Sequence, residues 1–272
     1  MTTEQRLIDA YCDLVPRAAA DQQEIGGFTL FVGRPGRTYY ARPTIGSTTP
    51  PTREDIEAVL QRQRELAVPE EFEWVHETCP ELGGIARAAG LSVRELPLMA
   101  LRTPLPAGVP HGYRVRVLPA DDPALPATLA AIGVAFGTPG TDPGAAGTAE
   151  RDNAIADDHD PRVRATTDQI RAGLFVLVAA DSDAGPVAGG SHSPRGPVTE
   201  ITGVATLPAH RRRGLGGAVT LALCAQAKAS GVELCFLSAD SDAVARVYAR
   251  VGFVRVGTSS LAAPGRLLFA PG

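Results

Sequence analysis

The 272-residue sequence has few aromatic residues, few cysteines and no long hydrophobic run. Aromatic side chains make up 5% of the chain, and there is a single tryptophan. No apolar stretch approaches the roughly 20 residues that a bilayer-spanning helix requires. The N-terminus also lacks the basic-then-apolar order of a secretory signal peptide. We therefore expect a cytoplasmic protein with no membrane partner.

The four cysteines are scattered rather than paired. None of them forms a C-x-x-C pair, so their spacing predicts neither a zinc site nor a disulfide framework. Cys224 lies in a predicted helix and Cys235 in an apolar predicted strand, where buried free thiols are the ordinary expectation. We therefore expect no metal.

The chain carries no excess of basic charge. It has 26 lysines and arginines against 30 aspartates and glutamates, and its net charge is −4. Such a balance gives no general attraction to nucleic acid or to anionic membranes. Three successive arginines at 211–213 are too few to change this expectation. With 44% hydrophobic residues, the chain is typical of a globular protein with a sizeable core.

The most informative stretch runs from Thr199 to Phe253. It begins with a β-prone run that Pro208 ends, because proline has no N–H for a strand ladder. An arginine- and glycine-rich turn, 211–217, follows and leads into a helical pattern. A turn of this kind leaves backbone N–H groups free at the helix start, where they bind anions. The glycines let a diphosphate approach the backbone closely. The stretch therefore predicts a phosphate-bearing ligand.

The same residues carry a family resemblance. The motif R-x-x-G-x-G at Arg211, Gly214 and Gly216 resembles the acyl-CoA diphosphate loop of the GNAT superfamily of N-acyltransferases. Farther on, V-Y-A-R-V-G-F at 247–253 is similar to the fourth helix of that family, with its frequent catalytic tyrosine. The resemblance covers the chain from Tyr113 onward. It implies an α/β (α+β) fold in which a mixed, mostly antiparallel sheet is flanked by helices.

The resemblance also implies a binding site for acetyl-CoA as co-substrate. The diphosphate would lie on the turn, formed by Arg211, Arg212, Arg213, Gly214, Leu215, Gly216 and Gly217. The pantetheine would pair with the end of the preceding strand, at Val204, Ala205 and Thr206, as an added strand. The neighbouring strand at 233–238 would have to separate from it to admit the thioester.

Two residues are candidates for proton transfer. Tyr248 stands where the family has its general acid, and its alternative role is packing on an amphipathic helix. Glu200 lies eleven positions before Arg211, the spacing of the base in the histone-acetylating branch. A desolvated carboxylate can act as a base, directly or through water. Its alternative role is that of a solvent-facing strand residue, and His192 is the second candidate base.

The first half of the chain contains a weaker copy of the second. Residues 72–91 align without gaps over 234–253, so that Gly90 matches Gly252 and Trp74 matches Phe236. The residue that matches Tyr248 is Ala86, and the segment before the helix at 52–66 has no glycine cluster. We therefore expect a tandem duplication with a degenerate GNAT-like domain at 1–105, a linker at 106–112 and a catalytic domain at 113–272. No site is expected in the first half, where Trp74, Tyr39 and Tyr40 are interpreted as core or interface aromatics.

Hydrophobic periodicity and turn residues place the remaining elements. The expected helices are 3–20, 52–66, 80–89, 123–136 and 163–172. The expected strands of the first half are 28–32, 37–41, 72–76 and 93–101, and the first two form a hairpin around a turn at 33–36. The expected strands that open the second half are 113–118, 175–180 and 186–193.

The predicted function is transfer of the acetyl group of acetyl-CoA to a primary amine of a small molecule, by direct attack in a ternary complex. A monomer or a homodimer is compatible with this function. A non-catalytic acyl-CoA-binding regulatory protein is a second possibility. The sequence is also compatible with an acyltransferase that takes its acyl group from a carrier protein or an aminoacyl-tRNA, and with one that acts on a peptide or protein amine.

Overall fold

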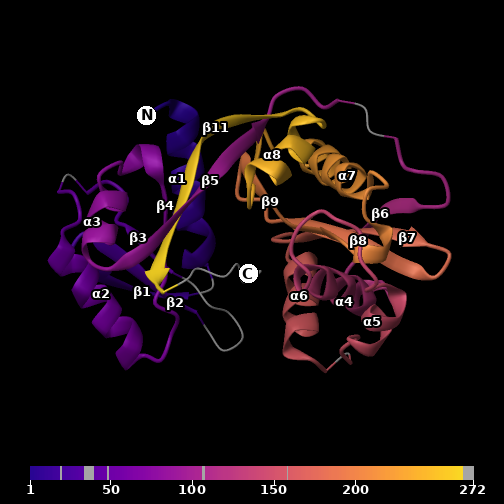
Figure 1. Ribbon diagram of the computed structural model, residues 1–272, viewed down its shortest axis with the longest axis horizontal. Coiled ribbons are helices and arrows are strands. Elements are labelled where there is room, and N and C mark those ends of the chain that lie inside the picture. Colours follow the sequence, from indigo (N-terminus) through magenta and orange to yellow (C-terminus); the bar gives the residue numbers. More distant parts are fainter. Residues whose placement is uncertain (19, 34–39, 48, 106–107, 158, 266–272) are drawn as a thin grey trace.

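The computed structural model describes residues 1–18, 20–33, 40–47, 49–105, 108–157 and 159–265. Within these residues one sheet of eleven strands extends through both halves of the chain, in the order β1-β2-β3-β4-β11-β5-β10-β9-β8-β7-β6 (Figure 1). Neighbouring strands are antiparallel except for two parallel pairs, β3 with β4 and β9 with β10. Helices flank the sheet, so the fold is the mixed α/β arrangement that the sequence predicts.

The elements follow one another in two series. The first comprises α1 (Thr3–Arg17), β1 (Ala20–Ile25), β2 (Phe28–Gly33), β3 (Ala41–Pro43), α2 (Arg53–Glu65), β4 (Phe72–Val75), the 3₁₀ helix η1 (His76–Thr78), α3 (Leu82–Ala88) and β5 (Leu91–Leu101). The second comprises β6 (Arg114–Leu118), α4 (Leu125–Phe136), α5 (Thr148–Asn153), α6 (Pro161–Arg171), β7 (Val176–Ser182), β8 (Gly185–His192), β9 (Val198–Thr206), the 3₁₀ helix η2 (Pro208–His210), α7 (Leu215–Ala229), β10 (Leu234–Ser238), α8 (Asp242–Ala249) and β11 (Phe253–Pro264).

Most expected elements are confirmed to within a few residues, and the sequence did not predict one described strand, one described α-helix and the two short 3₁₀ helices. Strand β1 is missed because its sequence, A-D-Q-Q-E-I, is polar and its outer residues are exposed, so it has no apolar alternation. It forms a hairpin with β2, in which Ile25 lies opposite Phe28. Helix α5 is missed because it is short and polar. The strand expected at 37–41 and the turn at 33–36 fall mostly outside the described residues, and β3 begins at Ala41.

The two halves share a strand–helix–strand arrangement, as the sequence repeat predicts. The unit β4–α3–β5 corresponds to β10–α8–β11, and each unit is preceded by a strand that runs parallel to its first strand. The matched glycines Gly90 and Gly252 follow the two helices with φ values of 85° and 104°. These left-handed conformations favour glycine, which explains why both copies keep it.

The last strand of each unit lies inside the other half of the sheet. Strand β11 lies between β4 and β5, and β5 lies between β11 and β10. The two strands are antiparallel, from Phe253 opposite Leu101 to Pro264 opposite Leu91, and they cross the centre of the molecule in Figure 1. The sheet is therefore continuous across the segment 106–112, and each half borrows one strand from the other.

Alternation along β10 separates two faces of the sheet. Cys235 and Leu237 point into the core beneath α7 and α8. Phe236 points to the opposite face, where its ring meets the edge of Tyr11 on α1 at a centroid distance of 5.2 Å. We call these the α7/α8 face and the α1 face. Since successive strand residues point to opposite faces, the face of each site residue can be assigned.

Candidate functional site

Strands β9 and β10 part in the middle of the sheet. They pair in parallel at three positions, the last of which joins Glu200 to Phe236. Beyond this pair β9 runs on to Thr206, while β10 continues to Ser238 along β5 instead. The separation that the family resemblance implies is therefore present, and we call its starting point the fork. Past the fork, no described strand pairs with the β10 side of β9, where Val204, Ala205 and Thr206 lie.

A β-bulge reorients β9 just past the fork. The pairing with β8 shifts register between Gly189 and Ser191, so that two residues of β9 lie opposite one residue of β8. Gly203 has a φ of 64° at this point. An extra residue in one strand bends it and changes the face to which its side chains point. As a result Val204 packs against the core beneath α7, whereas Glu200 keeps to the α1 face.

The turn before α7 presents a row of unpartnered N–H groups. Gly214 caps the 15-residue helix with a φ of 84°, and Arg212 has a φ of 62°. Among the described residues, the backbone N–H groups of 212–217 have no hydrogen-bond acceptor. A Cβ added to Gly216 would meet nothing within 4 Å, so the turn faces open space. With its helix dipole and the exposed side chains of Arg212 and Arg213, the turn fits a diphosphate.

Arg211 does something different from its two neighbours. Its guanidinium donates to four main-chain carbonyl oxygens: Thr206 at 3.1 Å, Asp142 at 3.1 Å, Ala135 at 3.0 Å and Thr138 at 2.6 Å. Its donors are therefore used within the protein, where they join the end of β9 to the end of α4 and the loop after it. Arg211 holds the turn in place, and the positive charge at its open surface comes from Arg212 and Arg213.

Tyr248 is half-buried on α8, on the α7/α8 face. Its ring lies 6.0 Å from that of Phe253, between centroids. Its hydroxyl makes no hydrogen bond with a described residue, and burial raises the pKa of Tyr248 to about 12. The phenol is thus protonated at neutral pH, as a general acid must be. The same packing is what a purely structural tyrosine would show.

Glu200 lies at the fork on the opposite, α1 face. It pairs with Phe236, and residues directly opposite one another on paired strands share a face. Burial raises the pKa of Glu200 to about 8; Glu73 also raises it, and Arg42 lowers it. A carboxyl with this pKa is mostly protonated at neutral pH, and its ionised form, which increases toward pH 8 and above, can take a proton from an ammonium group. Glu200 and Tyr248 therefore lie on opposite faces of the sheet.

His192, the second candidate base, is fully buried on β8. Its Nδ1 lies 3.0 Å from the hydroxyl of Thr199, and its Nε2 lies 2.7 Å from the amide oxygen of Gln226. Both ring nitrogens are occupied, and burial lowers the pKa of the imidazole. This geometry is that of a structural histidine and leaves Glu200 as the candidate base.

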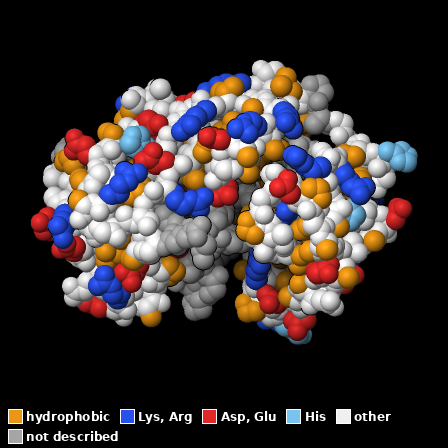
Figure 2. Space-filling model, viewed as in Figure 1, with side chains coloured by type: hydrophobic (Ala, Val, Ile, Leu, Met, Phe, Trp, Pro, Cys, Tyr) orange, Lys and Arg blue, Asp and Glu red, His pale blue; other side chains and the backbone are white. Residues whose placement is uncertain are grey.

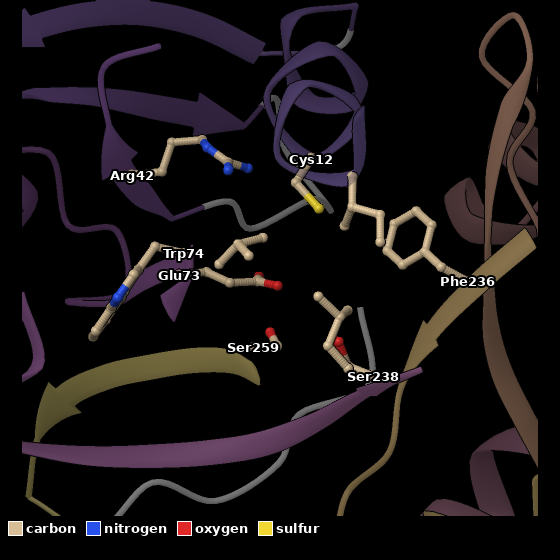
Figure 3. A pocket seen from close by; sticks show the side chains of 10 residues that line it. Cys12, Arg42, Glu73, Trp74, Phe236, Ser238 and Ser259 are labelled. Carbon is tan, nitrogen blue, oxygen red and sulfur yellow. The ribbon is translucent and has the colours of Figure 1, made fainter. Parts of the chain in front are cut away.

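A narrow crevice that the sequence did not predict opens beneath α1 (Figure 3). Its lining residues come from both halves of the chain: Ile8, Cys12, Arg42, Glu73, Trp74, Val75, Leu98, Phe236, Ser238 and Ser259. Phe236 and Ser238 connect it to the fork. The signal that was overlooked is a charged residue, Glu73, within the apolar strand F-E-W-V. Its side chain points away from the core of its own half and into the crevice.

The described residues were compared with what a nucleic-acid surface, a metal site and a membrane-spanning helix each require. On the face shown in Figure 2, basic and acidic side chains are interspersed over both halves, with no extended basic patch on this face. Within the described ranges, no three histidine, cysteine or acidic side chains are grouped as a metal site would require. The described helices include none of the length and apolar character needed to cross a membrane.

Comparison with known proteins identifies the second half of the chain. Residues 148–253 match the model of the acetyltransferase (GNAT) family. No curated protein matches the sequence. Among solved structures, a GCN5-related N-acetyltransferase from Kribbella flavida is similar with a TM-score of 0.69 and 23% identity, over 98% of this chain and 97% of that one.

Two further structures have the same fold along most of their length. A GCN5-related N-acetyltransferase-like protein from Streptococcus suis has a TM-score of 0.55 and 11% identity, over 96% of this chain and 98% of that one. A tandem GNAT protein from the clavulanic acid biosynthesis pathway has a TM-score of 0.53 and 17% identity, over 89% of this chain and 80% of that one. The chain thus has the tandem GNAT fold, and its residues 148–253 are a domain of the GNAT acetyltransferase family.

Proposed function

We propose that the protein transfers the acetyl group of acetyl-CoA to a primary amine of a small molecule, by direct attack within a ternary complex. The observation that carries this proposal is the row of unpartnered N–H groups at 212–217, next to the opening between β9 and β10. The family of residues 148–253 supports acyl transfer in general. The proposal adds acetyl-CoA as the acyl donor and a small primary amine as the acceptor.

The turn before α7 and the free edge of β9 each bind a different part of acetyl-CoA. The N–H groups of 212–217 hold the diphosphate, and Arg212 and Arg213 supply charge at its edge. The free edge of β9 at Val204, Ala205 and Thr206 pairs with the amides of the pantetheine arm as an added strand would. Acetyl-CoA supplies an activated acyl group as a thioester. These contacts direct the thioester to the fork, where Glu200 and Tyr248 flank the opening from opposite faces.

The residues at the fork manage protons rather than form covalent bonds. Glu200 takes a proton from the acceptor ammonium, directly or through water, so that a neutral amine attacks the thioester carbonyl. The new bond is N–C and the broken bond is C–S. Tyr248 protonates the departing sulfur and regains a proton from the nitrogen through water, so that one amine proton ends on the thiol. Positioning the two reactants supplies most of the acceleration in such a scheme.

Transfer through a cysteine is disfavoured by where the thiols lie. Cys224 and Cys235 are buried in the core beneath α7. Cys12 lies on the α1 face, and burial raises the pKa of its thiol well above the ordinary value. A protonated thiol is a poor nucleophile, so a thioester intermediate on the enzyme is not part of the proposed mechanism.

Two measurements test the proposal. Titration with acetyl-CoA in a calorimeter, compared with longer and malonyl esters, tests the donor. A spectrophotometric screen of amines with acetyl-CoA, which follows thiol release, tests turnover. We expect binding and amine-dependent thiol release. Binding without turnover on any amine, including peptide amines, would favour a regulatory protein, and no binding of free CoA esters would favour another acyl carrier.

A further inference from the structure

The crevice beneath α1 contains a buried cation with unmet donors. Arg42 on β3 has a side chain that is 0% exposed. One of its terminal nitrogens, Nη2, donates to the carboxylate of Asp9 on α1. Its Nε and Nη1 have no hydrogen-bond partner, although both are inaccessible to bulk solvent. Buried guanidinium donors are nearly always satisfied, so these two require an oxygen acceptor that the described protein atoms do not supply.

Two carboxyl groups with unmet hydrogen bonds share this face of the sheet with Arg42. Glu73 belongs to the first half of the chain and Glu200 to the second. Neither carboxylate has a hydrogen bond or an ion pair with a described residue, and Arg42 lies beyond ion-pair distance of both. Burial raises the pKa of Glu73 to about 7, and Glu73 in turn raises the pKa of Glu200. Arg42 is thus paired with Asp9 through one nitrogen only, and the two carboxyls near it have no direct partner among the described residues.

The order of these groups along the crevice defines what could fill it. Figure 3 shows Arg42 on one side, the carboxyl of Glu73 pointing to the middle, and Phe236 with Ser238 toward the fork. A ligand that extends from Arg42 to the fork meets the two unpartnered donors of Arg42 first and Glu200 last. Guanidinium groups are suited to carboxylates, and a carboxylate base is suited to an amine.

We propose that the acceptor is an amino acid rather than a simple amine, with its carboxylate bound by Arg42 and its amine directed to Glu200 at the fork. This inference rests on the proposed function and adds the class of acceptor. Glu73, supplied by the degenerate half, flanks the amine. The first half of the chain is thereby part of the acceptor site, although it has neither a glycine-rich turn nor a tyrosine at the position that matches Tyr248.

The size of the crevice limits the acceptor to a small molecule. The space between the lining atoms is about 240 Å³, its open mouth included. Because the crevice is narrow, binding an amino acid requires side chains of α1 to move, where Ile8 and Cys12 form one wall.

The direct test uses matched pairs of acceptors with the unaltered protein. Serine and ethanolamine, tyrosine and tyramine, lysine and cadaverine, and histidine and histamine each differ by one carboxylate. We expect the amino acid in at least one pair to have a kcat/KM about 10- to 100-fold higher than its amine, as the loss of a charged hydrogen bond predicts. Equal rates, or faster turnover of the amine in every pair, would overturn the proposal.

Two variants locate the selectivity. Arg42→Gln should reduce the preference for the amino acid to near unity while the KM for acetyl-CoA is unchanged. Asp9→Asn is the matched control, because it removes the partner of Arg42 but keeps the guanidinium, and the preference should persist. Selectivity retained in Arg42→Gln would contradict the proposal. If that variant does not fold, the matched pairs of amino acid and amine measured with the unaltered protein still test the proposal.

Binding separates a failure of this inference from a failure of the proposed function. The eight compounds are titrated against the protein with CoA present and no acetyl donor, by calorimetry. Selective binding of amino acids without any turnover would support the acceptor class and reject the acetyl-transfer mechanism. Thiol release with simple amines, together with no binding of any amino acid, would retain the mechanism and reject the acceptor class.

Discussion

Glu200 of β9 lies directly opposite Phe236 of β10 in the last parallel pair before the two strands part. This relationship places a carboxyl at the point where the sheet opens, and on the face covered by α1. The N–H groups before α7 and the hydroxyl of Tyr248 serve the other face. The proposed reaction therefore takes place through the sheet, with donor and acceptor arriving from opposite sides.

Tyr248→Phe should lower kcat by about 100-fold or more, the usual range for loss of a general acid. Acetyl-CoA binding should be unchanged, because the hydroxyl makes no hydrogen bond that holds the described structure together. Steady-state kinetics and calorimetry on the same preparation separate the two effects. Full activity of the variant at neutral pH would remove Tyr248 from the mechanism and leave it a packing role.

Glu200→Gln should abolish the acidic limb of the pH–rate profile. With its pKa raised to about 8 by burial, Glu200 is protonated at lower pH and cannot take a proton from the ammonium. The rate should therefore rise with pH, reach half its maximum near pH 8 in the unaltered protein, and be low and flat in the variant. The measurement is kcat/KM across pH 6–9. A limb that survives in Glu200→Gln belongs to another group.

The three arginines of the turn should respond differently to substitution. Arg212→Gln with Arg213→Gln should weaken acetyl-CoA binding and reduce its dependence on salt, because exposed charges act through screened attraction. Arg211→Gln should weaken binding at every salt concentration, since its four carbonyl partners would lose their donor and the turn its support. Affinity measured at two ionic strengths distinguishes them. The same salt dependence in both variants would contradict this division of roles.

The paired glycines offer a test of the fold. Gly90→Ala should cost about 1 kcal/mol of unfolding free energy, because the left-handed backbone is unfavourable for alanine but the site is open. Gly252→Ala should cost several times more, since its Cβ would lie 1.9 Å from the carbonyl oxygen of Thr103. Denaturant unfolding of both variants gives the comparison. Equal losses would mean that the contact at Thr103 is easily relieved.

Exchange of β5 and β11 predicts that neither half is stable alone. A fragment of residues 113–272 lacks β5, and a fragment of residues 1–105 lacks β11, so each would expose strand edges that the whole chain pairs. We expect each fragment to aggregate or remain unfolded, and the two to form a complex when expressed together. Size-exclusion chromatography measures aggregation and complex formation, and chemical-shift dispersion in NMR spectra shows whether each fragment is folded. Two well-folded separate fragments would contradict this expectation.

The sequence predicts the elements that depend on local signals. The β-prone run that ends before Pro208, the helix expected at 52–66, and the glycines after α3 and α8 are all local signals, and each element forms where expected. Matching 72–91 to 234–253 likewise predicts the shared strand–helix–strand unit. What the sequence could not give was the partner of each strand. Exchange of β5 and β11 depends on contacts between residues some 160 positions apart, and no local pattern carries them.

The parts of the site that depend on local motifs were also predictable from the sequence, and those that depend on strand pairing were not. The glycine-rich turn, the free edge of β9 and the place of Tyr248 follow from motif and order. The face on which Glu200 lies required the register with Phe236 and the bulge at Gly203. Arg42 and Glu73 come from strands of the first half, and only the folded sheet brings them near Glu200. Arg211, which belongs to the motif, donates instead to the loop after α4, and nothing local indicates that partner.

Binding of acetyl-CoA by the turn before α7 is the claim on which the proposed mechanism depends most. The direct measurement is a calorimetric titration of the protein with acetyl-CoA, repeated with Gly216→Pro, which removes one of the N–H groups at 212–217. We predict saturable binding at one site per chain that the variant weakens strongly, with the fold of the variant checked by circular dichroism. No detectable binding, or equal binding by the folded variant, would contradict it.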